Sequence, residues 1–358
     1  MKKNCTMNKL IIYILAFALA ACGHTQKKKG SRPEKIGLTA AGATFPLPYY
    51  NLAFKTYKDS TGVSVTYGGI GSGGGIRSLK DRIVDFGGSD AYLSDQELTD
   101  MPAEVIHIPA CLGAVVLAYN LPGIDRIRLT PDLAAAIFLG KVTHWNDNRI
   151  QAANPALSLP DLPIQPVYRS DGSGTTYVFS DYLSKVSEEW KQKAGVGKAL
   201  KWPTGIAAKG NPGVAGTISQ TPGAIGYIGS EYAFTLKIPV ASLQNRSGHF
   251  IEPTTESISA AAVNEIPADT RTMITDSPAA EAYPISCFTW IILYKEQAYA
   301  DRSESQARAT VELLDWMTGS TAQELTTRVH YSPLPAPAAN QAKKLLRTVV
   351  YQGKPILN

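Results

Sequence analysis

The segment Arg169-Ser170-Asp171-Gly172-Ser173-Gly174-Thr175-Thr176 lies between an apolar segment, Leu162 to Tyr168, and a segment with helical character, Tyr177 to Lys193. This order predicts a strand, a tight turn and the start of a helix. Free backbone N–H groups and the positive end of the helix dipole make such a helix start suited to binding an anion. An ordinary capped turn with a surface arginine has the same pattern, so this segment alone leaves both interpretations open.

Two further turns upstream have the same construction. Thr44-Phe45-Pro46 follows the strand-like segment Ile36 to Ala43, and Ser72-Gly73-Gly74-Gly75 follows the strand-like segment Val63 to Tyr67. Each turn combines a hydroxyl with small residues or a proline, and each leads into a helical pattern. Glycines allow a backbone to approach a ligand closely, and Arg169 can add a two-pronged charged contact. Three such helix starts favour a shared anion site over three unrelated turns.

Strand-like and helical segments alternate from Ile36 onward, which predicts an α/β fold with a mostly parallel sheet. Ligands of open α/β sheets collect at the carboxyl ends of the strands, where all three turns are expected. The length of 358 residues is enough for two domains, and the hydrophobic content of 44% is that of a globular protein.

The first 21 residues are predicted to be a signal peptide, because Lys2, Lys3 and Lys9 precede an apolar run that is too short to span a bilayer. Leu19-Ala20-Ala21-Cys22 resembles the lipobox of bacterial lipoproteins, in which the cysteine is lipidated and becomes the new N-terminus. Ordinary cleavage near Ala18-Leu19-Ala20 is the alternative. Residues 22–35 lack apolar periodicity, so we expect them to be a flexible tether.

Charge and motifs exclude several classes of function. Removal of residues 1–21 lowers the formal net charge from +5 to +2, which gives no support to nucleic-acid binding. The chain has no P-loop motif and no G-x-S-x-G around Ser72 or Ser173. Gly69-Ile70-Gly71-Ser72-Gly73-Gly74 fits a dinucleotide pattern, but glycine-rich sequence fits it easily. The five histidines are scattered without metal-ligand spacing, so we expect no metal, no cofactor and no enzyme activity.

Asp90 follows the predicted strand Ile83 to Gly87, again at a carboxyl end. By default such a residue caps a helix. A carboxylate next to an anion site repels its ligand, unless the anion carries a proton that it can donate. Phosphate at neutral pH carries such a proton and sulfate does not. A buried Asp90 would therefore select for a protonated oxyanion, because a fully ionised one would leave two acceptors facing each other.

Two cysteines remain in the mature chain if Cys5 is removed and Cys22 is lipidated. Cys111 and Cys287 could pair in an oxidising compartment, or they could be two small buried residues. The sequence leaves both possibilities open.

Five motifs together resemble, in order, the periplasmic phosphate-binding proteins of ABC phosphate importers, and the resemblance spans Ile36 to about Ala336. The motifs are Ala41-Gly42-Ala43-Thr44-Phe45-Pro46, Gly69-Ile70-Gly71-Ser72-Gly73-Gly74, Val84-Asp85-Phe86-Gly87-Gly88-Ser89-Asp90, Arg169-Ser170-Asp171-Gly172-Ser173-Gly174-Thr175 and Pro222-Gly223-Ala224-Ile225-Gly226-Tyr227. Gly73 stands where a second serine is common in the family, and Gly88 replaces a frequent alanine.

The resemblance implies a two-lobed type II periplasmic-binding-protein fold with two strands crossing at the hinge. Lobe I would comprise residues 36–120 and 285–358, and lobe II residues 121–284. Cys111 and Cys287 would lie on the crossing strands, where a disulfide is one possible outcome. The phosphate contacts implied by motif matching are Thr44, Phe45 through its backbone N–H, Ser72, Asp90, Arg169, Ser173, Gly174 and Thr175, with Asp171 pairing with Arg169 to temper its charge.

The implied function is to bind inorganic phosphate in the cleft between the lobes and deliver it to a membrane permease with its ATPase. We expect a monomer, lipid-anchored at the extracytoplasmic face of the cell envelope. Three alternatives remain open from the sequence. They are a binder of another tetrahedral oxyanion, a phosphate-sensing or scavenging lipoprotein without a transporter, and a phosphatase or phosphotransferase with a related fold. The sequence argues against the phosphatase or phosphotransferase, because it offers neither a nucleophile next to a base nor a metal cluster.

Overall fold

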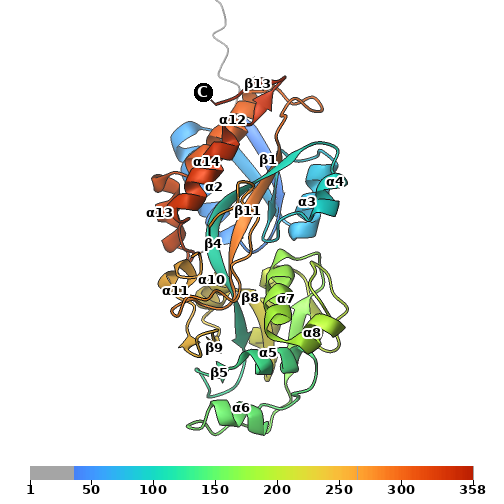
Figure 1. Cartoon of the computed structure of the whole chain (residues 1–358), viewed down its shortest axis with the longest axis vertical. Coiled ribbons are helices and arrows are strands. Elements are labelled where there is room, and N and C mark those ends of the chain that lie inside the picture. The colour runs from blue at the N-terminus through green and yellow to red at the C-terminus, as the bar shows by residue number, and fades with distance from the viewer. Residues whose placement is uncertain (1–35, 264, 358) are drawn as a thin grey trace, which may run out of the picture. The chain divides into compact units, whose positions relative to one another are not determined.

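A computed structural model describes residues 36–263 and 265–357, which form one compact unit (Figure 1). The strands are β1 Gly37–Gly42, β2 Ser64–Gly69, β3 Phe86–Ser89, β4 Val105–Tyr119, β5 Arg128–Leu129, β6 Gln165–Arg169, β7 Ile206–Ala208, β8 Ala224–Gly229, β9 Ser242–Gln244, β10 Phe250–Ile251, β11 Ser286–Tyr294, β12 Val350–Tyr351 and β13 Lys354–Pro355.

The helices begin at α2, in the numbering of Figure 1. They are α2 Leu47–Thr61, α3 Ser72–Lys80, α4 Asp95–Thr99, α5 Pro131–Phe138, α6 Asn148–Ala153, α7 Gly174–Val186, α8 Glu188–Lys193, α9 Gly210–Gln220, α10 Ser230–Leu236, α11 Thr255–Ser259, α12 Glu304–Met317, α13 Ser320–Thr327 and α14 Ala336–Leu346. None of the helices in the described part of the chain is both long and apolar enough to cross a bilayer.

Eight strands form one sheet in the order β2-β1-β3-β11-β4-β8-β6-β7. The strands β2, β1 and β3 pair in parallel, and we call them the β1 end of the sheet. The strands β8, β6 and β7 also pair in parallel and form the β6 end. Between the two ends, β11 and β4 pair in antiparallel fashion with each other and with their outer neighbours. The predicted α/β fold is confirmed.

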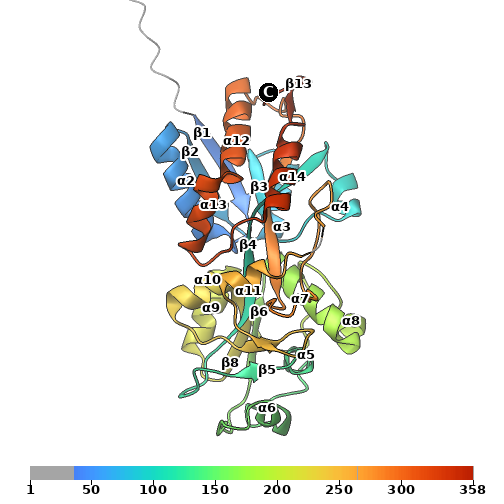
Figure 2. The ribbon, with the colours of Figure 1, turned by 60° about the vertical axis from the view of Figure 1, so that its left-hand side comes forward.

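The long strand β4 joins the two ends of the sheet. Its residues from Val105 to Ala114 pair with β11, and those from Val115 to Tyr119 pair with β8. Every residue of β4 is buried, as is every residue of β11. Figure 2 shows β4 running between the part of the fold that holds β1 and β3 and the part that holds β6 and β8. The predicted boundaries of the two lobes stay a prediction.

Helices cover both faces of the sheet, so its parallel strands can be apolar throughout. At the β1 end, α2, α12, α13 and α14 lie on one side, and α3 and α4 lie on the other (Figure 1). One hydrophobic core runs from Phe54 and Phe86 at the β1 end to Phe179 and Tyr227 at the β6 end. The same core thus supports the strands at both ends of the sheet.

A helix follows each of the parallel strands of this sheet. Helix α2 follows β1, α3 follows β2, α4 follows β3, α7 follows β6, α9 follows β7, and α10 follows β8. The sequence predicted the starts of α2, α3 and α7. It predicted one helix from Tyr177 to Lys193, whereas the structure has α7 and α8, which Ser187 separates. Ser187 is extended, and its side chain accepts a hydrogen bond from the backbone N–H of Trp190, so it caps a new helix rather than continuing the first.

Candidate functional site

The start of α7 is buried and well capped. The Ser173 hydroxyl accepts a hydrogen bond from the backbone N–H of Thr176 at 3.0 Å, as an N-cap residue does. Ser173, Thr175 and Thr176 have no exposed surface. The segment that the sequence singled out is therefore a strand, a turn and a helix start, as predicted.

Arg169 ends β6 and points its guanidinium toward this helix start. Its side chain is 1% exposed and makes a two-pronged pair with Asp171, with Nε to Oδ1 at 2.8 Å and Nη2 to Oδ2 at 2.6 Å. Nη1 donates to the Thr175 hydroxyl at 3.2 Å. Burial alone would raise the pKa of Asp171, but the hydrogen bonds and charge of Arg169 lower it below its ordinary value. The pairing of Asp171 with Arg169 that the resemblance implied is present.

Ser72, the first residue of α3, connects the two ends of the sheet. Its hydroxyl oxygen accepts a hydrogen bond from the backbone N–H of Gly174 at 3.0 Å and another from that of Asp90 at 3.3 Å. The backbone N–H of Gly73 donates to the carbonyl of Gly172 at 2.9 Å. The starts of α3 and α7 therefore face each other, as the shared anion site requires.

Glycines make this close approach possible. A Cβ built on Gly174 would lie 2.4 Å from the Ser72 hydroxyl oxygen and 2.8 Å from the backbone nitrogen of Asp90. A Cβ on Gly71 would lie 2.4 Å from Oδ2 of Asp171, and Gly71 also has a φ of +86°, which side chains rarely adopt. Larger residues at these two positions would force the two helix starts apart.

Asp90 lies between these helix starts and is 1% exposed. The Thr289 hydroxyl of β11 donates to its Oδ1 at 2.8 Å. Burial raises the pKa of Asp90 to about 7, although hydrogen bonds from Thr289 and Thr175 and the charge of Arg169 act in the opposite direction. The carboxyl group is therefore buried next to the guanidinium, as the sequence interpretation of Asp90 requires.

We expect the contribution of Asp90 to the stability of the phosphate-free protein to fall as the pH rises from about 4 to about 7. In this window the folded protein holds a proton on Asp90 that the unfolded chain, with a pKa near 3.8, has already released. Each step up in pH therefore favours the unfolded state. Urea unfolding of the wild type and of Asp90→Asn at several pH values measures this. The difference between their free energies of unfolding should change with pH across the window, and a constant difference would contradict the assignment.

Thr44 completes the group from the β1 end. It is 4% exposed and precedes α2, and its hydroxyl oxygen accepts hydrogen bonds from the backbone N–H and the side-chain amide of Asn211, both at 3.0 Å. Phe45 directs its ring into the core against Tyr331, whose hydroxyl donates to the Phe45 carbonyl at 2.5 Å. The structure thus brings together the predicted residues Thr44, Ser72, Asp90, Arg169, Ser173, Gly174 and Thr175, with Phe45 adjacent to Thr44 in the chain. Their role as phosphate ligands stays a prediction.

Sequence reasoning missed Asn211, which lies at the start of α9 and is fully buried. Its side chain touches the hydroxyls of Thr44 and Thr175, and the neighbouring Gly210 donates its backbone N–H to Asp171 at 3.0 Å. The available signal was the glycine-rich run from Gly205 to Gly216, in which the short strand β7 leads into the start of α9, as strands do at the three predicted turns. The weak apolar pattern of α9 concealed it.

The disulfide that the sequence left possible is not formed, because Cys111 and Cys287 are both free thiols and both buried. They lie on the neighbouring strands β4 and β11, but Cys111 is opposite Thr289, and Cys287 is opposite Gly113. Such diagonal residues are about 7–8 Å apart in an antiparallel pair, whereas disulfides need Cα atoms within about 7 Å. Burial raises the pKa of each thiol. The alternative of two small buried residues is therefore correct.

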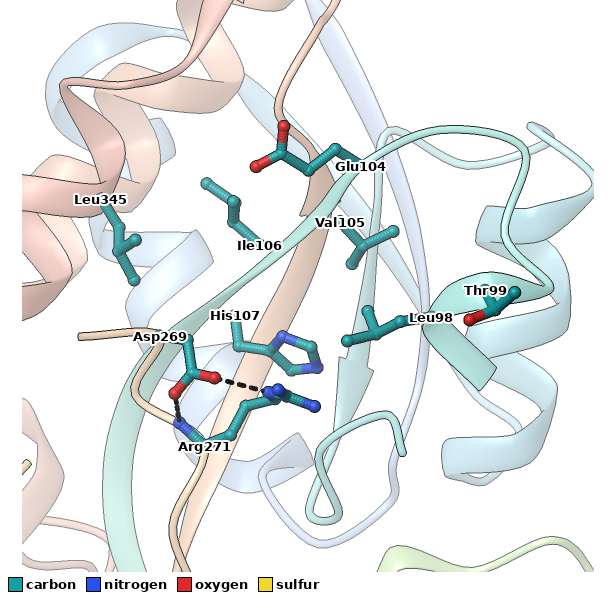
Figure 3. A pocket seen from close by; sticks show the side chains of 9 residues that line it. All are labelled: Leu98, Thr99, Glu104, Val105, Ile106, His107, Asp269, Arg271 and Leu345. Atoms are coloured by element: carbon teal, nitrogen blue, oxygen red, sulfur yellow. Dashed lines mark hydrogen bonds and ion pairs between the residues drawn. The ribbon is translucent and has the colours of Figure 1, made fainter. Parts of the chain in front are cut away.

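A separate cavity of about 450 Å³ lies beside the first part of β4 (Figure 3). Its cationic side chain, Arg271, is already paired with Asp269 at 2.8 Å and with Asp95 at 2.9 Å. His107 accepts a hydrogen bond from the backbone N–H of Leu93 at 3.0 Å, and burial lowers its pKa to about 3, so it is neutral. With its charges compensated, this cavity is a poorer anion site than the cluster around Arg169.

The predicted signal peptide, tether and lipidated Cys22 lie outside the residues that the structure describes.

The chain is similar to known proteins in both sequence and fold. The family model of the PBP superfamily domain matches residues 24–321. The phosphate-binding protein PstS of Xylella fastidiosa (strain 9a5c) is 40% identical over 316 residues, which cover 87% of this chain and 85% of the relative. The phosphate-binding protein PstS of Haemophilus influenzae is 38% identical over 320 residues, covering 88% of this chain and 94% of the relative. Both relatives are named as binding proteins and not as enzymes.

Solved structures show the same fold. A high affinity periplasmic phosphate-binding protein (PfluDING) bound with phosphate matches with a TM-score of 0.70 and 22% identity, over 86% of this chain and 93% of that one. A phosphate-binding protein from Stenotrophomonas maltophilia matches with a TM-score of 0.65 and 20% identity, over the same shares. The expected type II periplasmic-binding-protein fold is therefore confirmed. From its sequence relatives and its fold, the chain belongs to the PstS family of phosphate-binding proteins.

Proposed function

We propose that this protein binds one inorganic phosphate ion between the β1 and β6 ends of the sheet and delivers it to an ABC phosphate permease with its ATPase. The observation that carries the proposal is the meeting of helix starts from both ends around Arg169 and Asp90. The ligand contacts are Thr44, the backbone N–H of Phe45, Ser72, Asp90, Arg169, Ser173, Gly174 and Thr175. The protein acts by binding and release rather than by catalysis.

Charge explains why phosphate suits this site. Arg169 supplies a positive charge, and Asp171 partly offsets it through the two-pronged pair. Helix starts supply backbone N–H donors, which bind an anion without adding a full charge. Asp90 is an acceptor among these donors, so it can accept a hydrogen bond from the proton of a phosphate ion. A fully ionised sulfate has no such proton and would face the carboxylate with its own acceptors.

The two ends of the sheet act as lobes in this proposal. Residues 36–120 and 285–358 form lobe I, residues 121–284 form lobe II, and the chain crosses between them at β4 and at the start of β11. Ser72 and Thr44 contact Gly174 and Asn211 across the cleft, so these bonds form only when the lobes are closed. Phosphate then favours the closed form because it is bound by both lobes at once.

The proposal also covers the location of the protein in the cell. A lipid on Cys22 would anchor a monomer at the extracytoplasmic face of the cell envelope, with residues 22–35 as the tether. The supporting observation is the basic start and apolar run that end in Leu19-Ala20-Ala21-Cys22. The mass of the mature N-terminal peptide distinguishes an acylated Cys22 from ordinary cleavage a few residues earlier.

Calorimetric titration of the phosphate-stripped, full-length protein with phosphate, arsenate and sulfate tests the function. We expect saturable binding of phosphate with one ion per chain and tighter binding of phosphate than of sulfate. Arsenate shares the shape and the proton of phosphate, so it is the matched positive ligand. Tighter binding of sulfate would contradict the role of Asp90, and no binding of any of the three ions would contradict the function.

A further inference from the structure

Asn211 is a buried side chain whose every polar atom has a partner. It lies at the start of α9 and has no exposed surface. Its amide nitrogen Nδ2 lies 3.0 Å from the hydroxyl oxygen of Thr44 and 3.2 Å from that of Thr175. Its amide oxygen Oδ1 lies 3.0 Å from the backbone nitrogen of Gly229, at the end of β8. One side chain therefore connects a helix start of the β1 end with two elements of the β6 end.

The orientation of the Asn211 amide follows from its contact with Gly229. A backbone N–H can only donate, so the atom facing it must be the amide oxygen and not the NH₂ group. The NH₂ group then faces the two threonines, and its two hydrogens match the two hydroxyl oxygens. Both threonine hydroxyls must accept from Asn211, because an NH₂ group cannot accept a hydrogen bond.

The hydroxyl oxygens of Thr44 and Thr175 therefore each accept two hydrogen bonds. Thr44 Oγ1 accepts from the backbone N–H and from Nδ2 of Asn211, each at 3.0 Å. Thr175 Oγ1 accepts from Nδ2 of Asn211 and from Nη1 of Arg169, each at 3.2 Å. A hydroxyl has two acceptor lone pairs and one hydrogen. With both lone pairs occupied, the only hydrogen bond left to either threonine is one that it donates.

The hydroxyl oxygen of Ser72 also has both lone pairs occupied, in this case by backbone N–H groups. Its hydroxyl oxygen accepts from the backbone N–H groups of Gly174 at 3.0 Å and Asp90 at 3.3 Å. Three hydroxyls of the site can thus only donate, and the hydrogen of Thr175 is directed at the Asp90 carboxyl in this structure, so a bound anion competes with Asp90 for it. Backbone groups impose this on Ser72, whereas the side chain of Asn211 imposes it on the two threonines.

We propose that Asn211 is a positioning residue that directs the O–H groups of Thr44 and Thr175 to donate to the bound anion. The inference rests on the proposed binding of phosphate, and it assigns to Asn211 a part in selecting that ligand. The hydroxyls cannot turn to accept a hydrogen bond, so a ligand must offer them acceptor oxygens. Asp90 is then left as the acceptor for a ligand proton.

A double-mutant cycle with Thr44 tests the proposal. In the otherwise wild-type protein, Asn211→Ala should weaken phosphate binding about tenfold, because two hydroxyls lose their fixed direction. In a Thr44→Val background, where only Thr175 remains to be directed, the same substitution should weaken binding only about threefold. Titration calorimetry on the four full-length proteins gives both factors. The loss of the Gly229 contact is common to both comparisons and therefore cancels.

A matched control is Asn154→Ala. Asn154 is also buried, and its amide hydrogen-bonds with the backbone of Arg128 and Ile150, remote from the site. Its loss should lower the melting temperature without changing phosphate affinity. The proposal is overturned if Asn211→Ala weakens binding by the same factor in both backgrounds, or does not weaken it at all. If the wild type itself does not bind phosphate, the proposed function fails instead, which the same titration shows.

Discussion

Replacing Arg169 with methionine should weaken phosphate binding about 100- to 1000-fold. Methionine keeps most of the volume of the arginine side chain but removes the charge that attracts the anion. It also leaves the Asp171 carboxylate, which is only 12% exposed, without its partner and close to the incoming anion. Both changes act against phosphate, so the expected loss is larger than for removal of a single hydrogen bond. Titration calorimetry on the full-length variant measures it.

The chain provides a matched control for this substitution in Arg149. Arg149 makes the same two-pronged contact with an aspartate two residues away, with Nε to Asp147 Oδ1 at 2.9 Å and Nη2 to Asp147 Oδ2 at 2.8 Å. Its side chain is 53% exposed and lies outside the site. Arg149→Met should change phosphate affinity little, because exposed ion pairs contribute little free energy. Equal losses in the two variants would show that Arg169 is not the charge that holds phosphate.

Replacing Gly174 with alanine should weaken phosphate binding about 10- to 100-fold while leaving the phosphate-free protein at least as stable. The added methyl group would lie 2.4 Å from the Ser72 hydroxyl oxygen, so the starts of α3 and α7 could not come together around the ligand. In an open form Ser72 and Asp90, which belong to the proposed lobe I, would move away from this methyl group. The φ of Gly174 lies outside the left-handed region, so alanine fits the helix start and restricts the unfolded chain.

Gly216→Ala is the control for Gly174→Ala. Gly216 also lies in a helix, α9, and a Cβ built on it has no neighbour within 4 Å. This variant should be slightly more stable than the wild type and should bind phosphate equally well. Thermal unfolding and titration calorimetry on both variants separate the two effects. If Gly174→Ala lowers the stability of the phosphate-free protein as much as its affinity, the glycine serves the fold rather than lobe closure.

The sequence was sufficient to predict the part of the site that depends on local pattern. A hydroxyl next to small residues, placed between a strand and a helix, has a backbone geometry that hardly depends on the rest of the fold. Ser72, Ser173 and Thr175 were found in this way, and Arg169 with them. The position of Asp90 at the end of a strand followed from the same alternation. Resemblance to a family added the prediction that Phe45 contacts the ligand through its backbone N–H, which side-chain chemistry would not suggest.

The contacts of Asn211 could not be predicted, because they join segments that are far apart in the chain. Thr44 and Asn211 are 167 residues apart, and only the assembled sheet brings them within hydrogen-bonding distance. The absence of a disulfide between Cys111 and Cys287 could not be predicted for a similar reason. Whether Cys111 and Cys287 lie opposite or diagonal to each other depends on the register of β4 and β11, which includes an irregularity near Thr289. Strand register is a property of the packed sheet rather than of either strand alone.

The position of β11 in the sheet has a consequence for how the newly made chain folds. β11 lies between β3 and β4, yet its residues are synthesised more than 160 positions after those of β4. The β1 end therefore stays incomplete on the ribosome while the β6 end can already assemble, since its strand β8 pairs with the last residues of β4. Long-range pairing of this kind slows folding. A polypeptide whose first strands pair only with its last ones therefore remains incompletely folded for longer.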